Sequence, residues 1–232
     1  MFIGGLQKTT LIDYPGKVAC TVFLAGCNFR CPWCYSPELV LSEEIRKLSK
    51  ISRKDFFKFL KSRKGLLDGV VICGGEPTIN KDLPDFIKQI KKLGYLVKLD
   101  TNGSNPEILK KLIKQKLIDY VAMDVKAVLG KEYKRATGGR ANLNNIKKSI
   151  NLIKNSEIDY EFRSTIVPGI HSKENIIKMA KQIGPAKTYF LQGFRAEKTL
   201  DPKFKKVRTY PKEYLLEASE SVKAFFTICK VR

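Results

Sequence analysis

The sequence predicts a single α/β domain whose parallel sheet curves into a partial, open TIM-type (βα)6 barrel. Short apolar, β-branched runs recur along the chain, and apolar residues at three- and four-residue spacing lie between them. Strands that alternate with helices favour a parallel sheet with helical crossovers. The length of 232 residues suits one undivided α/β barrel domain.

The predicted strands are the apolar runs, which are short and rich in β-branched residues. In chain order they cover residues 18–24, 69–73, 95–100, 120–124, 160–167, 188–192 and 225–231. The first six fit six βα units, and the seventh would lie at the far edge of the sheet.

The predicted helices lie between these runs, and each has apolar residues on one face. Their apolar positions are Phe56, Phe57 and Leu60; Leu83, Phe86, Ile87, Ile90 and Leu93; Ile108, Leu109, Leu112, Ile113 and Leu117; Ile146, Ile150 and Ile153; Ile176, Ile177, Ala180 and Ile183; Tyr214, Leu215, Ala218 and Val222. Ser52, Asn105 and Ser172 stand at expected N-cap positions, and Gly94 stands at an expected helix end.

The predicted domain covers residues 1–232, with a core of about 18–193. Residues 1–17 are expected to precede the first strand and to contain a turn at 13–16. A longer connection is expected at 35–51. Residues 194–232 are expected to form a basic loop, a helix and an edge strand.

The net charge of +21, from 44 Lys and Arg against 23 Asp and Glu, favours anionic partners. Lysine-rich helix faces that are merely solvated explain the same charge, and no aromatic–basic alternation predicts a nucleic-acid groove. No apolar run approaches the roughly 20 residues of a transmembrane helix, and the first residues do not resemble a signal peptide. We therefore expect a cytoplasmic protein without a membrane partner.

Three of the six cysteines, Cys27, Cys31 and Cys34, lie in one loop directly after the first predicted strand. Soft thiolates at this spacing favour zinc, cuprous copper or an iron–sulfur cluster. A structural zinc site needs a fourth Cys or His, and the only histidine, His171, is distant in sequence. A cubane cluster with one iron open to a small molecule explains three thiolates better.

The other three cysteines, Cys20, Cys73 and Cys229, lie inside or at the ends of predicted strands and are expected to pack as small hydrophobic residues. His171 directly precedes the predicted helix cap Ser172, and we expect it at the surface.

Polar and glycine-rich segments follow the predicted strands, where the chemistry of such barrels is found. They are Gly26-Cys27, Gly74-Gly75-Glu76-Pro77, Asp100-Thr101-Asn102-Gly103, Asp124-Val125-Lys126, Pro168-Gly169 and Gln192-Gly193. We therefore expect thiols, glycines, carboxylates and amides to meet at one rim. Asp100 and Asp124 have a simpler alternative explanation, in which they only cap the ends of their strands.

These motifs make the sequence similar to the radical S-adenosylmethionine (SAM) superfamily. The loop from Cys27 to Cys34, with Trp33 before its last cysteine, has the C-x3-C-x2-C pattern. Residues 4–16 and 26–39 resemble the glycyl-radical-enzyme activating proteins, and within these the anaerobic ribonucleotide reductase activating branch. The resemblance extends to at least residue 193.

The resemblance implies a [4Fe–4S] cluster on Cys27, Cys31 and Cys34, whose open iron binds SAM. It further implies a protein substrate, a glycyl-radical enzyme, and flavodoxin or ferredoxin as electron donor. By position, the implied SAM contacts are Trp33, Cys34, Tyr35, Gly74, Gly75, Glu76, Asp100, Thr101, Asp124, Val125, Lys126 and Gln192. A monovalent cation near the SAM carboxylate and a partner contact at Asp13 are also implied, although Tyr14 replaces a glycine common in the family.

Two other classes of function remain open at this point. The same motifs would serve a radical SAM enzyme that acts on a small molecule or on RNA, whose phosphates the basic charge would attract. A non-catalytic iron–sulfur or zinc protein would instead hold its metal with four protein ligands and have no affinity for SAM.

Overall fold

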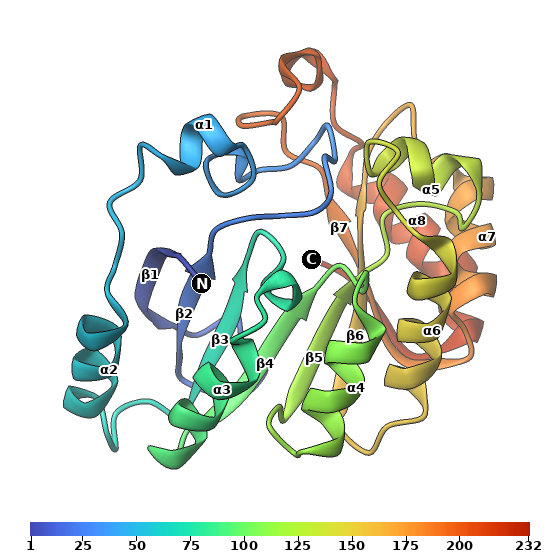
Figure 1. The fold of residues 1–232 in the computed structure, drawn as a ribbon. Coiled ribbons are helices and arrows are strands. Elements are labelled where there is room, and N and C mark those ends of the chain that lie inside the picture. The colour runs from blue at the N-terminus through green and yellow to red at the C-terminus, as the bar shows by residue number, and fades with distance from the viewer.

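The computed structural model describes residues 1–232 and contains one open, eight-stranded sheet (Figure 1). Its strands are β1 (Ile3–Thr10), β2 (Ala19–Leu24), β3 (Gly69–Gly74), β4 (Leu96–Thr101), β5 (Tyr120–Asp124), β6 (Asp159–Ile166), β7 (Ala186–Gly193) and β8 (Phe226–Val231). They are ordered in the sheet as they are in the chain, and all neighbours from β2 to β8 are parallel. The predicted partial barrel is confirmed.

Helices connect the parallel strands and surround the curved sheet (Figure 1), as parallel pairing requires. They are α1 (Ser42–Ile45), α2 (Arg53–Ser62), α3 (Leu83–Lys92), α4 (Pro106–Lys114), α5 (Lys131–Ala136), α6 (Leu143–Lys154), α7 (Lys173–Ile183) and α8 (Lys212–Val222), with short 3-10 turns η1 (Pro37–Leu39), η2 (Pro77–Ile79), η3 (Pro202–Lys206) and η4 (Lys223–Phe225). None of them has both the length and the apolar character needed to cross a membrane.

Two of the three predicted caps are present in the structure. Ser52 and Ser172 each precede a helix, and their hydroxyls accept hydrogen bonds from the backbone N–H groups of Asp55 and Asn175. Asn105 also precedes its helix, but its side chain donates to the carbonyl of Thr78, 2.9 Å away. Asn105 therefore joins the loop after β3 to the start of α4 instead of capping the helix.

The expectation that residues 1–17 precede the first strand is wrong. β1 (Ile3–Thr10) pairs antiparallel with β2 and forms one edge of the sheet. Its sequence hides the strand because two adjacent glycines and a run of exposed polar residues, 7–9, remove the alternation of apolar residues. The helix α5 was also not predicted, since its six residues are too few to show a helical period.

Tyr14 fills the interior of the barrel at the end opposite the strand termini that carry the polar motifs. Its side chain is 4% exposed and packs with Ala19 and Val71 in a small cluster separate from the main core. Its ring lies 5.9 Å from the ring of Tyr120, and a β-carbon on Gly69 would be 3.0 Å from it. Tyr14 thus fills the space between the first residues of these strands.

Candidate active site

A cavity of ≈ 950 Å³ lies at the carboxyl ends of the strands, between the cysteine loop and the sheet. Thirteen of the predicted site residues line it: Asp13, Cys27, Cys31, Trp33, Cys34, Tyr35, Gly74, Gly75, Asp100, Thr101, Asp124, Lys126 and Gln192. Two others, Glu76 and Val125, are buried beside it without lining it. The rim predicted from the ends of the strands is therefore one continuous site.

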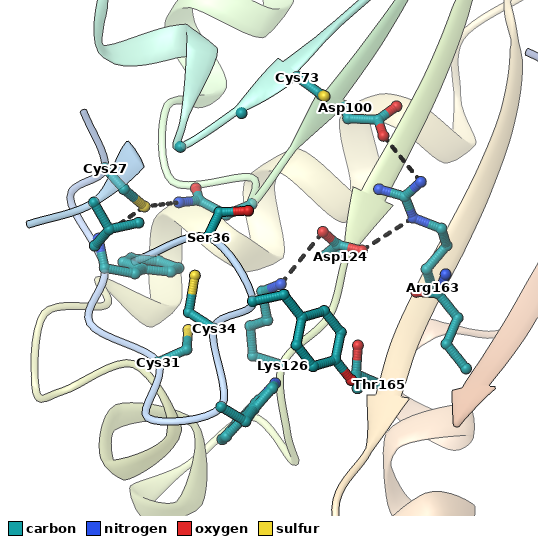
Figure 2. Close-up of a pocket in the computed structure, with 18 of the residues that line it drawn as sticks. Cys27, Cys31, Cys34, Ser36, Cys73, Asp100, Asp124, Lys126, Arg163 and Thr165 are labelled. Atoms are coloured by element: carbon teal, nitrogen blue, oxygen red, sulfur yellow. Dashed lines mark hydrogen bonds and ion pairs between the residues drawn. The ribbon is translucent and has the colours of Figure 1, made fainter. Parts of the chain in front are cut away.

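The cysteine loop presents three thiols to this cavity (Figure 2). Arg30 shapes the loop, because its guanidinium donates to the carbonyls of Cys27 and Phe29 at 2.7 and 2.8 Å. Burial raises the pKa of Cys27 to about 11 and that of Cys31 to about 12. Without a metal these thiols are protonated at neutral pH, so a metal that binds them displaces protons.

The chemistry of the donor set fits an iron–sulfur cluster. Cys27, Cys31 and Cys34 offer three soft sulfur donors from one loop, and all three line the same cavity. Cysteine thiolates are the usual ligands of such clusters.

Gly74 and Gly75 let the end of β3 approach the start of the cysteine loop. Gly74 has φ of +117°, and a β-carbon there would lie 2.4 Å from the carbonyl oxygen of Leu24. A β-carbon on Gly75 would lie 2.0 Å from the carbonyl oxygen of Gly26. Only glycine fits at such close backbone approach. The two glycines thus place bare backbone in the cavity wall beside Cys27.

Glu76 is a positioning residue beneath the cavity floor. Its carboxylate is fully buried and accepts hydrogen bonds from the N–H and hydroxyl of Thr78, the hydroxyl of Thr101 (2.8 Å) and the N–H of Asn102 (2.6 Å). Burial raises the pKa of Glu76, although these hydrogen bonds oppose the rise. The carboxylate ties the loops after β3 and β4 together, which orders both of them next to the thiols.

Arg163 lies between the two predicted carboxylates (Figure 2). Its guanidinium is 3.0 Å from Asp100 and 3.0 Å from Asp124, and the Lys126 ammonium is 3.3 Å from Asp124. Burial alone would raise the pKa of Asp124, but Arg163 and Lys126 lower it to about 2. Asp100 and Asp124 therefore belong to a charged cluster in the cavity and do not merely cap their strands.

Arg163 was not predicted, and a signal for it exists in the sequence. It is a charged residue inside the apolar run 160–167, where side chains are normally buried. The same holds for Glu161, which is fully buried and binds the Arg232 guanidinium at 2.9 Å. Other lining residues that were not predicted as site residues are Ile12, Phe23, Phe29, Ser36, Val40, Cys73, Asn102, Thr165, Gly193, Arg195 and Arg232. Cys73 was expected to pack only as a small hydrophobic residue, yet it faces the cavity.

The expectation that His171 is a surface residue is wrong, because its side chain is fully buried. Its Nδ1 accepts a hydrogen bond from the N–H of Val167, which leaves Nε2–H to donate to the carbonyl of Lys126, both at 2.9 Å. Its ring meets the edge of Trp33 at 5.9 Å. His171 thus supports the backbone of the Asp124-Val125-Lys126 segment from behind.

Stability should depend on pH through His171, the only histidine of the chain. Burial lowers the pKa of His171 to about 4, whereas an unfolded histidine titrates near 6.5. The neutral ring is thus favoured by folding. The neutral ring adds its full contribution to the free energy of unfolding above pH 6.5. This contribution, about 3 kcal/mol, is lost as the pH falls from 6.5 to 4. Urea unfolding of the untagged protein at pH 7.5, 6 and 5 measures this loss.

The control for this prediction is His171→Gln, whose side chain cannot take up a proton in this range. We expect the variant to be less stable at pH 7.5 but to show a smaller loss between pH 7.5 and 5 than the wild type. If the free energy of unfolding fell by the same amount in both proteins between pH 7.5 and 5, His171 would not be the group responsible.

Comparisons with known proteins identify the family of the chain. A model of the Radical SAM superfamily matches residues 21–183. A Methanocaldococcus jannaschii protein named glycyl-radical enzyme activating enzyme is 35% identical over 99% of this chain and 95% of its own length. The pyruvate formate-lyase-activating enzyme of Clostridium pasteurianum is 31% identical over 78% of this chain and 75% of its length.

Among solved structures, SuiB of Streptococcus suis bound to its precursor peptide SuiA covers 91% of this chain with a TM-score of 0.69. The aligned part is 48% of SuiB, and the sequence identity is 16%, so this likeness concerns the fold. The family match and the two sequence relatives together show that the chain is a radical SAM enzyme and belongs to the glycyl-radical-enzyme activating enzymes.

Proposed function

We propose that the chain is an activase that cleaves SAM reductively and removes a hydrogen atom from a glycine of a partner glycyl-radical enzyme, in the branch that serves anaerobic ribonucleotide reductase. The observation that carries this proposal is the single cavity shared by the three thiols of the cysteine loop and a set of opposite charges. SAM combines a sulfonium, an amino acid and an adenosine, and the cavity has groups suited to each.

Cys27, Cys31 and Cys34 would hold the [4Fe–4S] cluster and leave one iron free for SAM. The bound cluster supplies the electron that breaks the sulfur–C5′ bond. That electron would come from flavodoxin or ferredoxin, and the net charge of +21 supports an acidic donor. The surrounding cavity wall keeps water away from the reacting atoms.

The methionine and adenosine parts of SAM would contact different segments of the cavity wall. The bare backbone of Gly74 and Gly75 suits the amino group, and the ammonium of Lys126 suits the carboxylate. The adenosine part would lie along Trp33 to Tyr35 and against Gln192. The Tyr35 hydroxyl accepts a hydrogen bond from the N–H of Arg195 at 2.8 Å, so the adenine contact there is expected from the backbone.

The monovalent cation implied by the family would share its carboxylates with a guanidinium. Asp100 and Asp124 both contact Arg163, so a cation bound between them has to coexist with that positive charge or displace it. Thr101 would offer a further oxygen to the cation.

The partner's glycine loop would enter beside Asp13. The Asp13 carboxylate lines the cavity and accepts a hydrogen bond from the Thr21 hydroxyl at 2.8 Å. Next to it, Leu11 and Ile12 are 72% and 83% exposed, and Ile12 also reaches the cavity. An apolar tip at the mouth of a charged cavity supports docking of a protein segment rather than of a small polar molecule.

Low-temperature electron paramagnetic resonance of the anaerobically reconstituted, reduced protein tests the chemistry. We expect a [4Fe–4S]⁺ signal that changes when SAM is added, together with 5′-deoxyadenosine in the product. Co-expression with an anaerobic ribonucleotide reductase should then give a glycyl radical on that partner. Bound zinc, or a cluster that does not respond to SAM, would refute the proposal. SAM cleavage without any glycyl radical would favour a small-molecule or RNA substrate.

A further inference from the structure

We propose that residues 131–140 and 195–208, here called the basic collar, form the docking face for an acidic one-electron carrier protein. The inference rests on the proposed function, which needs one electron from outside for each SAM cleaved. It adds the place where that electron enters.

The basic collar encloses the cysteine loop from two sides. On one side the N–H of Arg30 donates to the carbonyl of Thr137 at 3.1 Å. On the other, the N–H of Asp201 donates to the carbonyl of Pro32 at 2.8 Å. Figure 1 shows the orange segment before α8 beside the blue loop that carries the cysteines. A protein that covers the collar would therefore sit directly on the cysteine loop.

The charge of the collar is strongly positive and mostly unpaired. Its ten basic residues are Lys131, Lys134, Arg135, Arg140, Arg195, Lys198, Lys203, Lys205, Lys206 and Arg208, against three acidic residues, Glu132, Glu197 and Asp201. Among these cations only Lys198 forms an ion pair, with Glu38 at 2.7 Å. Exposed cations without partners produce a positive potential that attracts and orients an acidic protein.

The position of the collar indicates that the protein docking there is an electron donor and not the partner that carries the glycine. A glycine must enter the cavity for its hydrogen to be removed, and Asp13 marks that entrance. An electron can cross packed protein, so its donor only has to rest against the outside of the cysteine loop. The ring of Phe204 in the collar lies 6.3 Å from the ring of Trp33, which directly precedes Cys34. The collar therefore has a short packed connection to the thiols.

The aromatic residues of the collar argue against a nucleic acid. Single-stranded nucleic acid binds to exposed aromatic rings on which its bases stack. Here Tyr133 is fully buried and Phe204 is half-buried against Trp33, so the collar exposes mainly cationic side chains and no fully exposed aromatic ring. A folded acidic protein fits such a surface better.

The electron carrier and SAM together balance the reaction, without a further oxidant or reductant. The carrier is oxidised by one electron, and that electron enters the sulfur–C5′ bond of SAM. Methionine leaves with its sulfur electron pair restored, and the 5′-deoxyadenosyl radical takes one hydrogen atom from the glycine.

The test compares two charge reversals of equal size. Lys203→Glu, Lys205→Glu and Lys206→Glu together change the collar. Lys110→Glu, Lys111→Glu and Lys114→Glu change three exposed lysines of α4, outside the collar. Calorimetric titration with an oxidised flavodoxin measures binding to the reconstituted proteins at low and raised salt. SAM cleavage is measured in parallel with dithionite and with reduced flavodoxin.

We expect the collar variant to bind flavodoxin about tenfold or more weakly, and the α4 variant to bind like the wild type. Raised salt should weaken the wild-type complex most. The collar variant should cleave SAM normally with dithionite and slowly with reduced flavodoxin. If the two variants bind flavodoxin equally well, the collar is not its docking face. The proposal would also fail if the collar variant lost affinity for an RNA oligonucleotide but still bound flavodoxin like the wild type. No SAM cleavage by the wild type with dithionite would refute the proposed function instead.

Discussion

Replacing Cys31 by alanine is expected to abolish cluster assembly and SAM cleavage. Cys31 is the middle residue of the cysteine loop, and its thiol is 8% exposed on the cavity wall. Losing one of three thiolates leaves two ligands, which are too few to retain a cubane with one open iron. Iron and sulfide content after anaerobic reconstitution, together with 5′-deoxyadenosine formation, measure the effect.

Two matched cysteine variants serve as controls. Cys229→Ala lies on β8, where the thiol contacts Ser219 at 3.4 Å, and it should keep full iron and activity. Cys73→Ala removes a further thiol that lines the cavity and should keep the cluster. If Cys73→Ala also loses its metal, the site has four thiolate ligands, and a closed structural metal centre becomes the better explanation.

Replacing Arg163 by methionine is expected to lower the free energy of unfolding by about 3 kcal/mol at pH 7. The change leaves Asp100 and Asp124 poorly exposed and without the guanidinium that binds both. The pKa of Asp124, about 2 in the wild type, should rise. A carboxylate with a lowered pKa stabilises the fold above its unfolded pKa, so the difference between variant and wild type should shrink as the pH falls towards 2.

Two further variants separate charge from shape at this position. Arg163→Lys keeps the positive charge but cannot reach both carboxylates with a fork of N–H groups, so an intermediate loss is expected. Combining Arg163→Met with Asp124→Asn removes a carboxylate that has lost its guanidinium and should recover part of the stability. Asp100 is left unchanged because it also binds the buried ammonium of Lys98. Urea unfolding of the wild type, these three variants and Asp124→Asn alone provides the data, and a double variant that is less stable than the sum of its two single changes would contradict the ion-pair account.

Much of the fold could be predicted because its parallel strands are buried on both faces and therefore read as apolar runs. The segment 69–73 is an example, and β3 occupies Gly69–Gly74. β1 escaped prediction because an edge strand with glycines and one solvated face lacks such a run. The short α5 escaped because its burial depends on contacts with distant segments and not on its own periodicity.

Some residues of the candidate site could be predicted from the sequence, and others could not. Gly74 and Asp124 end their strands and Cys27 follows one, so local sequence and the barrel rule together predicted their place. The pairing of Arg163 with two carboxylates on other strands depends on sheet order and register, which the sequence does not display. The burial of His171 depends on the backbone of Lys126, 45 residues away, and no local pattern records such a contact.

The strand order has a consequence for how the protein is made. Since β1 to β8 follow each other in space as in sequence, a nascent chain can add each strand to the edge of the one before it as it leaves the ribosome. The cysteine loop emerges early, but Arg163 and Gln192 complete its cavity only after most of the chain has been synthesised. Until then the three thiols face solvent on an unfinished half-barrel. Iron delivered during translation would find no enclosed site, so cluster loading should wait for the released, fully folded chain.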